Sequence, residues 1–569
     1  MYYDGKILIG KTQEGEDICI YPKMANRHGL IAGATGTGKT VTLKVMAESF
    51  SDAGVPVFLA DAKGDLAGTC QKGVQSEDMD KRIEYFDLAS KGFDFKSYPV
   101  NFWDVYGEGG IPLRTTISEM GPLLLARIMD LNDTQADILN IIFRIADDNS
   151  LLLIDTKDLK SMIQYVDENS KELSAEYGNL PSASLNVILR AVITLESNGG
   201  EQFFAEPALN IKDWLAVNDS GKGLIQVLDC RKLMLNPKTY SMFLLWMISE
   251  LYETLPEAGD LEKPKMVFFF DEAHMLFDSA PKVLLEKIEQ VVKLIRSKGV
   301  GIYFITQNPK DIPDGVLSQL GNKVQHALHA YTPNEQKSMK AAADGLRSNP
   351  KFNTYQVLGE LGTGEALVSV LGEDGVPGVV QRTKILPPAS FMGAIDDDVR
   401  TSKIDACYLS GKYRDYVDND SAYERLTALA ADEAEAEAKA KEEQERIKAE
   451  EKAKEEEEKA LAKEKAAQEK EAAKAEAKAQ REAEKAEAKA QKEAEKAEAA
   501  ALKAAQKEKD AKDKAVKRAV KSVASSTAGS VGRELGKSVG KSVGGSFGKT
   551  LGGNVGASLF RGIIGTFMK

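Results

Sequence analysis

The sequence predicts an α/β protein built on a mostly parallel β-sheet, and three observations support this fold class. Residues 1–400 alternate short apolar segments with stretches of helical periodicity, which is typical of α/β folds. Most apolar segments are continuous, as in strands that are buried on both faces of a parallel sheet. One of them leads into a glycine-rich loop and then a helix. We expect strands at 6–10, 29–33, 55–60, 223–228, 265–270, 299–306, 323–328 and 365–370.

One block of the chain departs from this alternation. Between residues 112 and 217 the helical period dominates. The clearest helical patterns lie at 123–131, 136–148 and 184–195. We therefore expect a largely helical insertion over 112–217. Residues 1–111 and 218–400 would then form the two parts of one α/β core.

The stretch IAGATGTGKT (31–40) contains the phosphate-loop pattern G-x-x-x-x-G-K-[ST]. Backbone N–H groups of such a loop wrap around phosphates, the lysine reaches the β and γ oxygens, and the hydroxyl ligates Mg²⁺. An apolar strand precedes the loop, and a helix whose N-terminus faces the anion follows it. The sequence thus predicts an ATP site with Lys39 on the γ-phosphate and Thr40 on Mg²⁺. The nucleotide-binding residues are expected to be Gly33, Ala34, Thr35, Gly36, Thr37, Gly38, Lys39 and Thr40.

Three more Gly-Lys-Ser/Thr triplets occur within LGKSVGKSVGGSFGKT (535–550), but they do not form phosphate loops. The first glycine of the pattern is replaced in all three by an apolar residue: Val531, Leu535 or Val543. The triplets result from a repeat with glycine at every fourth position between 532 and 556. Such small residues allow close helix packing, and the lysines suit an anionic surface. We expect the tail, 521–569, to dock on an anionic membrane surface or a partner helix; the alternative is a flexible Gly/Ser end.

Charge is distributed unevenly along the 569 residues. The formal net charge is -12, whereas seven basic residues and one acid give residues 521–569 a net charge of +6, so residues 1–520 carry -18. This acidic balance argues against a protein that coats nucleic acid non-specifically, but it allows a ring with a locally basic channel.

The four cysteines form no CxxC motif, which suits a reducing compartment. With no signal peptide or long apolar stretch in the sequence, we expect a cytoplasmic location, with peripheral membrane contact through the tail.

Composition changes near 401–426, which we interpret as a linker. Residues 427–520 consist almost entirely of alanine, glutamate and lysine, and KAEAKAQREAE (474–484) repeats almost unchanged at 485–495. Eleven residues in three turns is close to the period of a straight helix. The segment is predicted to be a long charged helix. A solvated rod is favoured over a coiled coil because the repeating stripe is alanine.

The second half of an active site is expected at KMVFFFDEAH (265–274), where an apolar strand ends in two acids. Asp271 would bind Mg²⁺, and Glu272 would polarise the attacking water. A later strand ends at Thr306, so Gln307 could sense the γ-phosphate or orient water. A helix cap for the acids and a loop hydrogen bond for Gln307 are the alternatives. The histidines are interpreted as structural, and no His/Cys metal site is visible.

Five motifs together resemble the HerA-like branch of the HerA/FtsK DNA-translocating ATPases, most closely the bacterial helicases of the YjgR type. They are GATGTGKT, VFLADAKGDL (57–66), FFFDEAH, FITQNPKDIP and QLGNKVQHALHAYTP (319–333). The resemblance covers about residues 1–390. It implies a RecA-like core, hexameric assembly and action on double-stranded DNA. It also implies that Lys39 and Thr40 form the Walker A pair, Asp271 and Glu272 the Walker B pair, and Gln307 the sensor.

The chain departs from this family pattern at His329, where relatives tend to carry an arginine. If that arginine contacts phosphate across a subunit interface, another residue must take its role here. The candidates are Arg144, Arg231, Arg296 and Arg382. The sequence does not choose among them.

We therefore expect a Mg²⁺-dependent, ATP-hydrolysing motor that acts on double-stranded DNA as a homo-oligomer. One alternative is the same ATPase acting on protein or at a membrane, which the acidic body and basic tail suggest. Another is a scaffold that binds ATP without hydrolysing it. Glu272 speaks against the scaffold, because a protein that only binds ATP does not need a water-activating acid.

Overall fold

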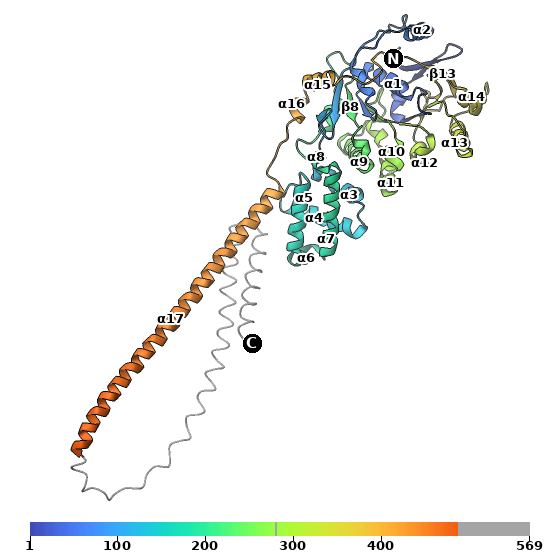
Figure 1. The fold of residues 1–569 in the computed structure, drawn as a ribbon. Helices are drawn as coiled ribbons and strands as arrows, with labels where there is room; N and C mark the ends of the chain where they lie inside the picture. The colour runs from blue at the N-terminus through green and yellow to red at the C-terminus, as the bar shows by residue number, and fades with distance from the viewer. Residues whose placement is uncertain (279–281, 488–569) are drawn as a thin grey trace. The chain divides into compact units, whose positions relative to one another are not determined.

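The computed structural model describes residues 1–278 and 282–487 (Figure 1). The chain divides into two compact units, Met1–Tyr423 and Glu424–Lys569. The strands lie in the first unit, at β1 (Tyr2–Tyr3), β2 (Lys6–Thr12), β3 (Asp17–Ile20), β4 (Gly29–Ala32), β5 (Val57–Asp61), β6 (Val100–Asp104), β7 (Ile111–Pro112), β8 (Ile225–Asp229), β9 (Met266–Phe270), β10 (Val300–Thr306), β11 (Asn322–His326), β12 (Glu365–Ser369) and β13 (Gln381–Ile385).

All these strands join one mixed sheet. Its order is β1-β2-β13-β12-β11-β4-β10-β9-β5-β8-β6-β7, and β3 pairs with β2. Every pairing from β11 to β7 is parallel, whereas β12, β13, β1, β2 and β3 pair antiparallel. The predicted α/β fold with a mostly parallel sheet is confirmed.

Each of the eight expected strands is present, with boundaries shifted by at most two residues. The strands that the sequence analysis did not predict are short or lie in the antiparallel part, such as β13 with the sequence QRTKI. Alternating polar residues weaken the apolar signal of such a strand. Its place in the sheet comes from pairing with β12 and β2, which are distant in sequence.

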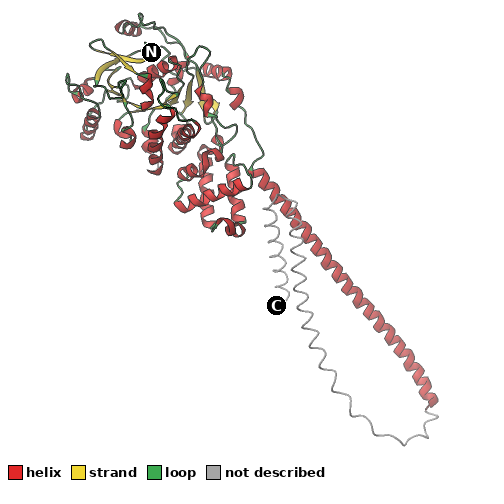
Figure 2. Ribbon diagram, turned by 180° about the vertical axis from the view of Figure 1, so that it is seen from behind, coloured by secondary structure: helices red, strands yellow, loops and turns green. Residues whose placement is uncertain are grey.

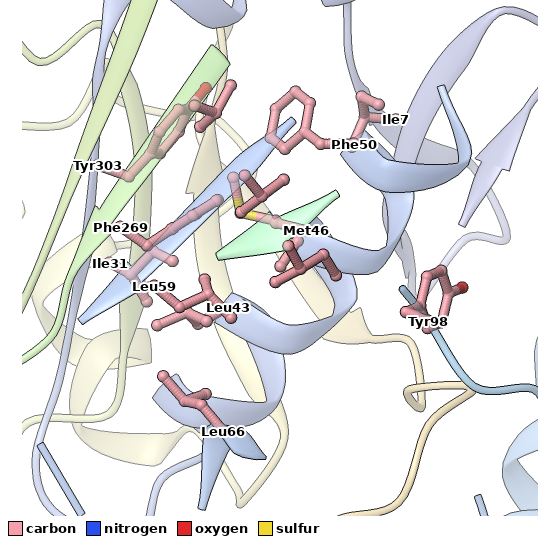
Figure 3. Close-up of a cluster of buried hydrophobic side chains, with 14 of the residues drawn as sticks. Ile7, Ile31, Leu43, Met46, Phe50, Leu59, Leu66, Tyr98, Phe269 and Tyr303 are labelled. Carbon is pink, nitrogen blue, oxygen red and sulfur yellow. The ribbon is translucent and has the colours of Figure 1, made fainter. Parts of the chain in front are cut away.

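Helix α1 (Lys39–Asp52) packs on one face of the sheet. Its Met46 and Phe50 join a buried cluster with Leu59 of β5 and Phe269 of β9 (Figure 3). The ring centroids of Phe50 and Phe269 are 6.2 Å apart. This packing anchors the helix that begins at the phosphate loop.

The opposite face of the same strands is also covered. Phe58, next to Leu59 along β5, stacks on Trp214 at 5.1 Å between ring centroids and contacts Phe268 at 5.3 Å. Neighbouring residues of a strand point to opposite faces, and here both are buried. Burial on both faces is the reason why these strands appear in the sequence as continuous apolar runs.

All the helices between β7 and β8 lie within the block predicted to be helical, 112–217 (Figure 2). Those helices are α3 (Ile117–Ile128), α4 (Asp133–Asp148), α5 (Thr156–Glu168), α6 (Ser170–Tyr177), α7 (Ser182–Leu195) and α8 (Glu201–Phe203). Helices α3, α4, α5 and α7 pack against one another. Three of them begin with capping boxes at Thr116, Asn132 and Asp155. The boundaries of the insertion at 112 and 217 stay a prediction.

The remaining helices of the first unit are shorter or flank the sheet. They are α2 (Glu77–Tyr85), α9 (Pro237–Thr254), α10 (His274–Asp278), α11 (Lys282–Ile295), α12 (Asp314–Leu317), α13 (Pro333–Asp344), α14 (Thr354–Glu360), α15 (Asp397–Ala406) and α16 (Ser410–Tyr413). The expected linker, 401–426, holds the end of α15 and all of α16. Tyr413 is buried there, 5.6 Å from the Trp103 ring.

Helix α17 (Ala422–Glu487) is 66 residues long and accounts for the described part of the predicted charged segment. Its ion pairs follow helical spacing, as in Glu435–Lys439 at 2.7 Å. Among the described residues, no helix is both long and apolar enough to cross a membrane. Residues 488–569, with the rest of this segment and the basic tail, lie outside the described residues. The rod, the coiled coil and the docking role of the tail therefore stay predictions.

Candidate functional site

Four adjacent parallel strands bring the candidate site residues to one edge of the sheet. In the order β4, β10, β9, β5, their carboxyl ends lead into the phosphate loop, Gln307, the acid pair Asp271–Glu272, and the loop that contains Lys63. The carboxyl edge of a parallel sheet is where ligands bind in open α/β folds.

The phosphate loop, 33–38, requires glycine at two close approaches. Gly33 has φ of +152°, and a Cβ atom there would lie 2.5 Å from the Cβ atom of His326. Gly38 has φ of +110°, and a Cβ atom there would lie 3.3 Å from the backbone nitrogen of Gly364. The hydroxyl of Thr37 closes the loop by donating to the carbonyl of Ala34 at 2.7 Å. A side chain at Gly33 would collide with His326, and one at Gly38 would press on the backbone of Gly364, so both positions favour glycine.

Lys39 starts helix α1 and folds back over the loop. Its ammonium donates to the carbonyls of Gly33 at 2.7 Å and Ala34 at 3.1 Å. Burial lowers the pKa of Lys39, although the charge of Glu272 acts against this shift. In the first turn of α1, the N–H of Thr42 donates a hydrogen bond to the carbonyl of Gly38 at 3.0 Å. The N–H groups before it in the first turn are available to an anion, as at any helix N-terminus.

His326, at the end of β11, packs against the phosphate loop and links helix α1 to β12 through two hydrogen bonds. Its Nδ1 donates to the carbonyl of Glu365 at 2.9 Å, and its Nε2 accepts from the hydroxyl of Thr42 at 2.8 Å. Burial lowers the pKa of His326 to about 4, so the ring is neutral at pH 7. His326 is structural, as expected. The strand ends at His326, two residues before the expected end at 328, so His329 lies beyond it.

The acid pair follows β9 directly. The side chains of Asp271 and Glu272 are almost fully buried. Burial, together with the adjacent charge of Glu272, raises the pKa of Asp271 to about 7. Glu272 has φ of +48°, a conformation that is uncommon outside glycine, and its N–H donates to Oδ1 of Asp271 at 2.9 Å. The turn aims the two carboxyl groups differently although they are neighbours in sequence.

Three side chains surround the carboxyl group of Glu272. Nζ of Lys63 is 2.7 Å from Oε1 and Nδ1 of His274 is 3.3 Å from Oε2, and the nearby Gln307 side chain helps to lower the pKa of Glu272. Burial would raise the pKa of Glu272, but the hydrogen bond and charge of Lys63 hold it below its ordinary value. Of these partners the sequence analysis singled out only Gln307. Lys63 could have been found from its position directly after a buried strand, in ADAKGD, because such positions lie at the carboxyl edge of the sheet.

The oxygen atoms at this edge fit Mg²⁺. Thr40 lies in the first turn of α1, and Asp271 is the acid at the end of β9. A hydroxyl and one carboxylate, completed by phosphate and water, are the kind of ligands that Mg²⁺ takes in nucleotide sites. Within the described ranges no group of three or more His, Cys, Asp or Glu side chains forms a metal site.

The four candidate arginines are distributed over the first unit. Arg144 pairs with Asp148, Arg231 with Asp229 and Arg382 with Glu365, at 3.0, 2.5 and 2.8 Å. Arg296 follows α11, and burial lowers its pKa. The role of any of them at a neighbouring subunit stays a prediction.

A phosphate loop on β4 and an acid pair on β9, separated by one strand that ends beside Gln307, define the class of P-loop ATPases. The chain belongs to the family described as "Helicase HerA-like C-terminal", whose model matches residues 6–476. The resemblance read from the motifs is thereby confirmed. The protein is an ATP-driven enzyme of this family.

Two curated relatives are similar to about two thirds of the chain. Both are called "DNA double-strand break repair helicase HerA". The protein from Sulfurisphaera tokodaii is 23% identical over 386 residues, which cover 65% of this chain and 67% of the relative. The protein from Sulfolobus acidocaldarius is 21% identical over 385 residues, with 64% and 66% coverage. Among solved structures, the plasmid coupling protein TrwB with a non-hydrolysable GTP analogue is 12% identical, with a TM-score of 0.45 over 65% of this chain and 87% of TrwB.

Proposed function

We propose that this protein is a Mg²⁺-dependent ATPase that translocates along or remodels double-stranded DNA. The observation that carries the proposal is the position of Glu272. Its buried carboxylate lies at the sheet edge that also holds the phosphate loop, pairs with Lys63, and has Gln307 near enough to lower its pKa. An acid in this place can accept the proton of an attacking water, which a protein that only binds ATP does not require.

The chain's own groups supply binding and alignment. N–H groups of the phosphate loop and the first turn of α1 bind the phosphates, and Lys39 neutralises charge that develops on the γ-phosphoryl group. Glu272 and Gln307 orient the water for in-line attack, and Glu272 accepts its proton. Thr40 and Asp271 would hold Mg²⁺, which would supply charge neutralisation at the phosphates.

DNA is the substrate that family membership favours, because both curated relatives are named as DNA repair helicases. Duplex DNA binds through its phosphates, so its effect on the ATPase should weaken as salt rises. We further propose that the working form is a homo-oligomer, a hexamer by the family resemblance. A neighbouring copy would then supply the arginine that replaces the family residue at His329.

The decisive experiment measures the ATPase rate with and without linear duplex DNA, at about 50 and 200 mM salt and with or without EDTA. We expect hydrolysis that requires Mg²⁺ and is stimulated by duplex DNA more strongly at the lower salt. The Lys39→Ala protein is the control, because it should lose nucleotide affinity and hydrolysis together. A Mg²⁺-dependent rate that duplex DNA leaves unchanged at both salt concentrations would retain the ATPase and reject DNA as the substrate.

A further inference from the structure

Lys63 is a charged residue at the site to which the proposed hydrolysis gives no role. It lies in the loop after β5, and its Nζ is 2.7 Å from Oε1 of Glu272. The Lys63 side chain is 51% exposed, whereas the Glu272 side chain is 10% exposed. An exposed cation is thus joined to the buried carboxylate that we assign to water activation.

The loop that carries Lys63 is held firmly in place. Asp61, buried at the end of β5, accepts hydrogen bonds from the N–H groups of Gly64 at 2.7 Å and Ala67 at 3.2 Å. Gly64 has φ of +84°, and a Cβ atom there would lie 3.3 Å from Cδ of Arg231. Because the backbone on the carboxyl side of Lys63 is fixed, the ion pair with Glu272 is a built feature of the site.

Lys63, in the loop after β5, and Lys39, at the start of α1, both interact with the charges of Glu272 and Asp271. The pKa of Lys39 responds to the charges of Glu272, Lys63 and Asp271, after the larger effect of burial. Burial would lower the pKa of Lys63, but the hydrogen bond and charge of Glu272 raise it above its ordinary value. Lys63 is therefore a cation at neutral pH, and its charge acts on Lys39 as well as on Glu272.

The ion pair opposes the chemistry assigned to Glu272. A carboxylate bonded to an ammonium group is a weaker proton acceptor, so Glu272 can act on water efficiently only after Lys63 has moved away. The ammonium then needs another anion nearby. Phosphate oxygens form strong charge-assisted hydrogen bonds with lysine.

We propose that Lys63 exchanges Glu272 for the terminal phosphate of a bound nucleoside triphosphate. Lys63 thereby recognises the triphosphate and frees Glu272 only when that phosphate is present. With a diphosphate, Lys63 stays paired with Glu272. This inference rests on the proposed ATPase function.

The test compares equilibrium affinities of the full-length protein for fluorescent ATPγS and ADP analogues in the presence of Mg²⁺. In Lys63→Ala, we expect ATPγS affinity to fall by about tenfold or more, because a charge-assisted contact is lost, while ADP affinity changes less than about twofold. Lys63→Gln, which keeps much of the side-chain length without the charge, should behave in the same way. Lys232→Ala is the matched control, since Lys232 is 52% exposed and pairs with Glu108 at 2.5 Å. It should bind both nucleotides as the wild type does.

A double-mutant cycle separates exchange from simple positioning of Glu272. Glu272→Gln weakens the competing ion pair, so it should raise ATPγS affinity, and this gain should disappear when Lys63 is also alanine. If Lys63 only positions Glu272, both Lys63 variants lower the hydrolysis rate and leave the ratio of ATPγS to ADP affinity unchanged. That unchanged ratio would overturn the inference while leaving the proposed function intact. A wild-type protein that binds neither nucleotide would overturn both.

Discussion

The sheet edge of the first unit and helix α17 each contain a Lys–Glu pair at 2.7 Å, yet the two pairs differ in their surroundings. Glu272, paired with Lys63, has a side chain that is 10% exposed. Glu435, paired with Lys439 on α17, has a side chain that is 66% exposed. The first pair lies among other buried charges at the ends of parallel strands, whereas the second is one of many i,i+4 pairs on a solvated helix.

The difference shows that distance alone does not define what an ion pair does. In water, the attraction between the two charges of an exposed pair is small and neighbouring pairs can replace it. In the partly buried site, burial and Lys63 together determine the pKa of Glu272, and each charge there changes its neighbours. The same contrast holds between two apolar residues, Phe50, which is fully buried in the first unit, and Leu461 on α17, which is 53% exposed.

The largest effect is expected on stability, when a buried apolar side chain of the first unit and an exposed one of α17 are each truncated. Phe50→Ala should lower the free energy of unfolding of the first unit by about 3–5 kcal/mol, because it leaves a cavity between α1 and the sheet. Leu461→Ala is the matched change on α17, where the leucine is 53% exposed. It should alter the free energy of unfolding by less than about 0.5 kcal/mol. Denaturant titration followed by tryptophan fluorescence measures both. Equal losses would contradict the assignment of the core.

The next effect concerns the two glutamates. Glu272→Gln should retain ATP binding and lose turnover by on the order of 10²-fold or more, because the proton acceptor is removed. Glu435→Gln should leave turnover unchanged. Steady-state ATPase assays with a parallel nucleotide titration separate binding from turnover. Near-wild-type turnover in Glu272→Gln would remove this residue from the mechanism.

The smallest effect on hydrolysis is expected from removing the charged helix. A protein that ends at residue 425 should keep its basal ATPase rate within about twofold, which corresponds to less than 0.5 kcal/mol, because the site lies in the first unit. It should also self-associate, and an ATP analogue should strengthen the association if a neighbour completes the site. Sedimentation velocity with and without ATPγS measures this. A strictly monomeric profile with full ATPase activity would reject the ring.

Much of the site could be predicted because its signals are local. The spacing from Gly33 to Lys39 and the acids directly after a strand are properties of short segments, and the structure places them at one sheet edge. The partners of Glu272 were harder to predict. Lys63 reaches it from the loop after β5, 209 positions away in the chain, and its place after a buried strand does not show that it pairs with Glu272.

The sequence by itself determined the α/β class, the eight main strands, the phosphate loop and the long charged helix, because periodicity and motif spacing are read within a few turns or strands. Only the tertiary structure decided the order of the strands, which places β10 between β4 and β9 and brings Lys39, Gln307 and Glu272 together. It also decided that His326 supports the phosphate loop and that Lys63 binds Glu272. These contacts join residues up to 284 positions apart in the chain, and such pairings depend on packing of the whole sheet.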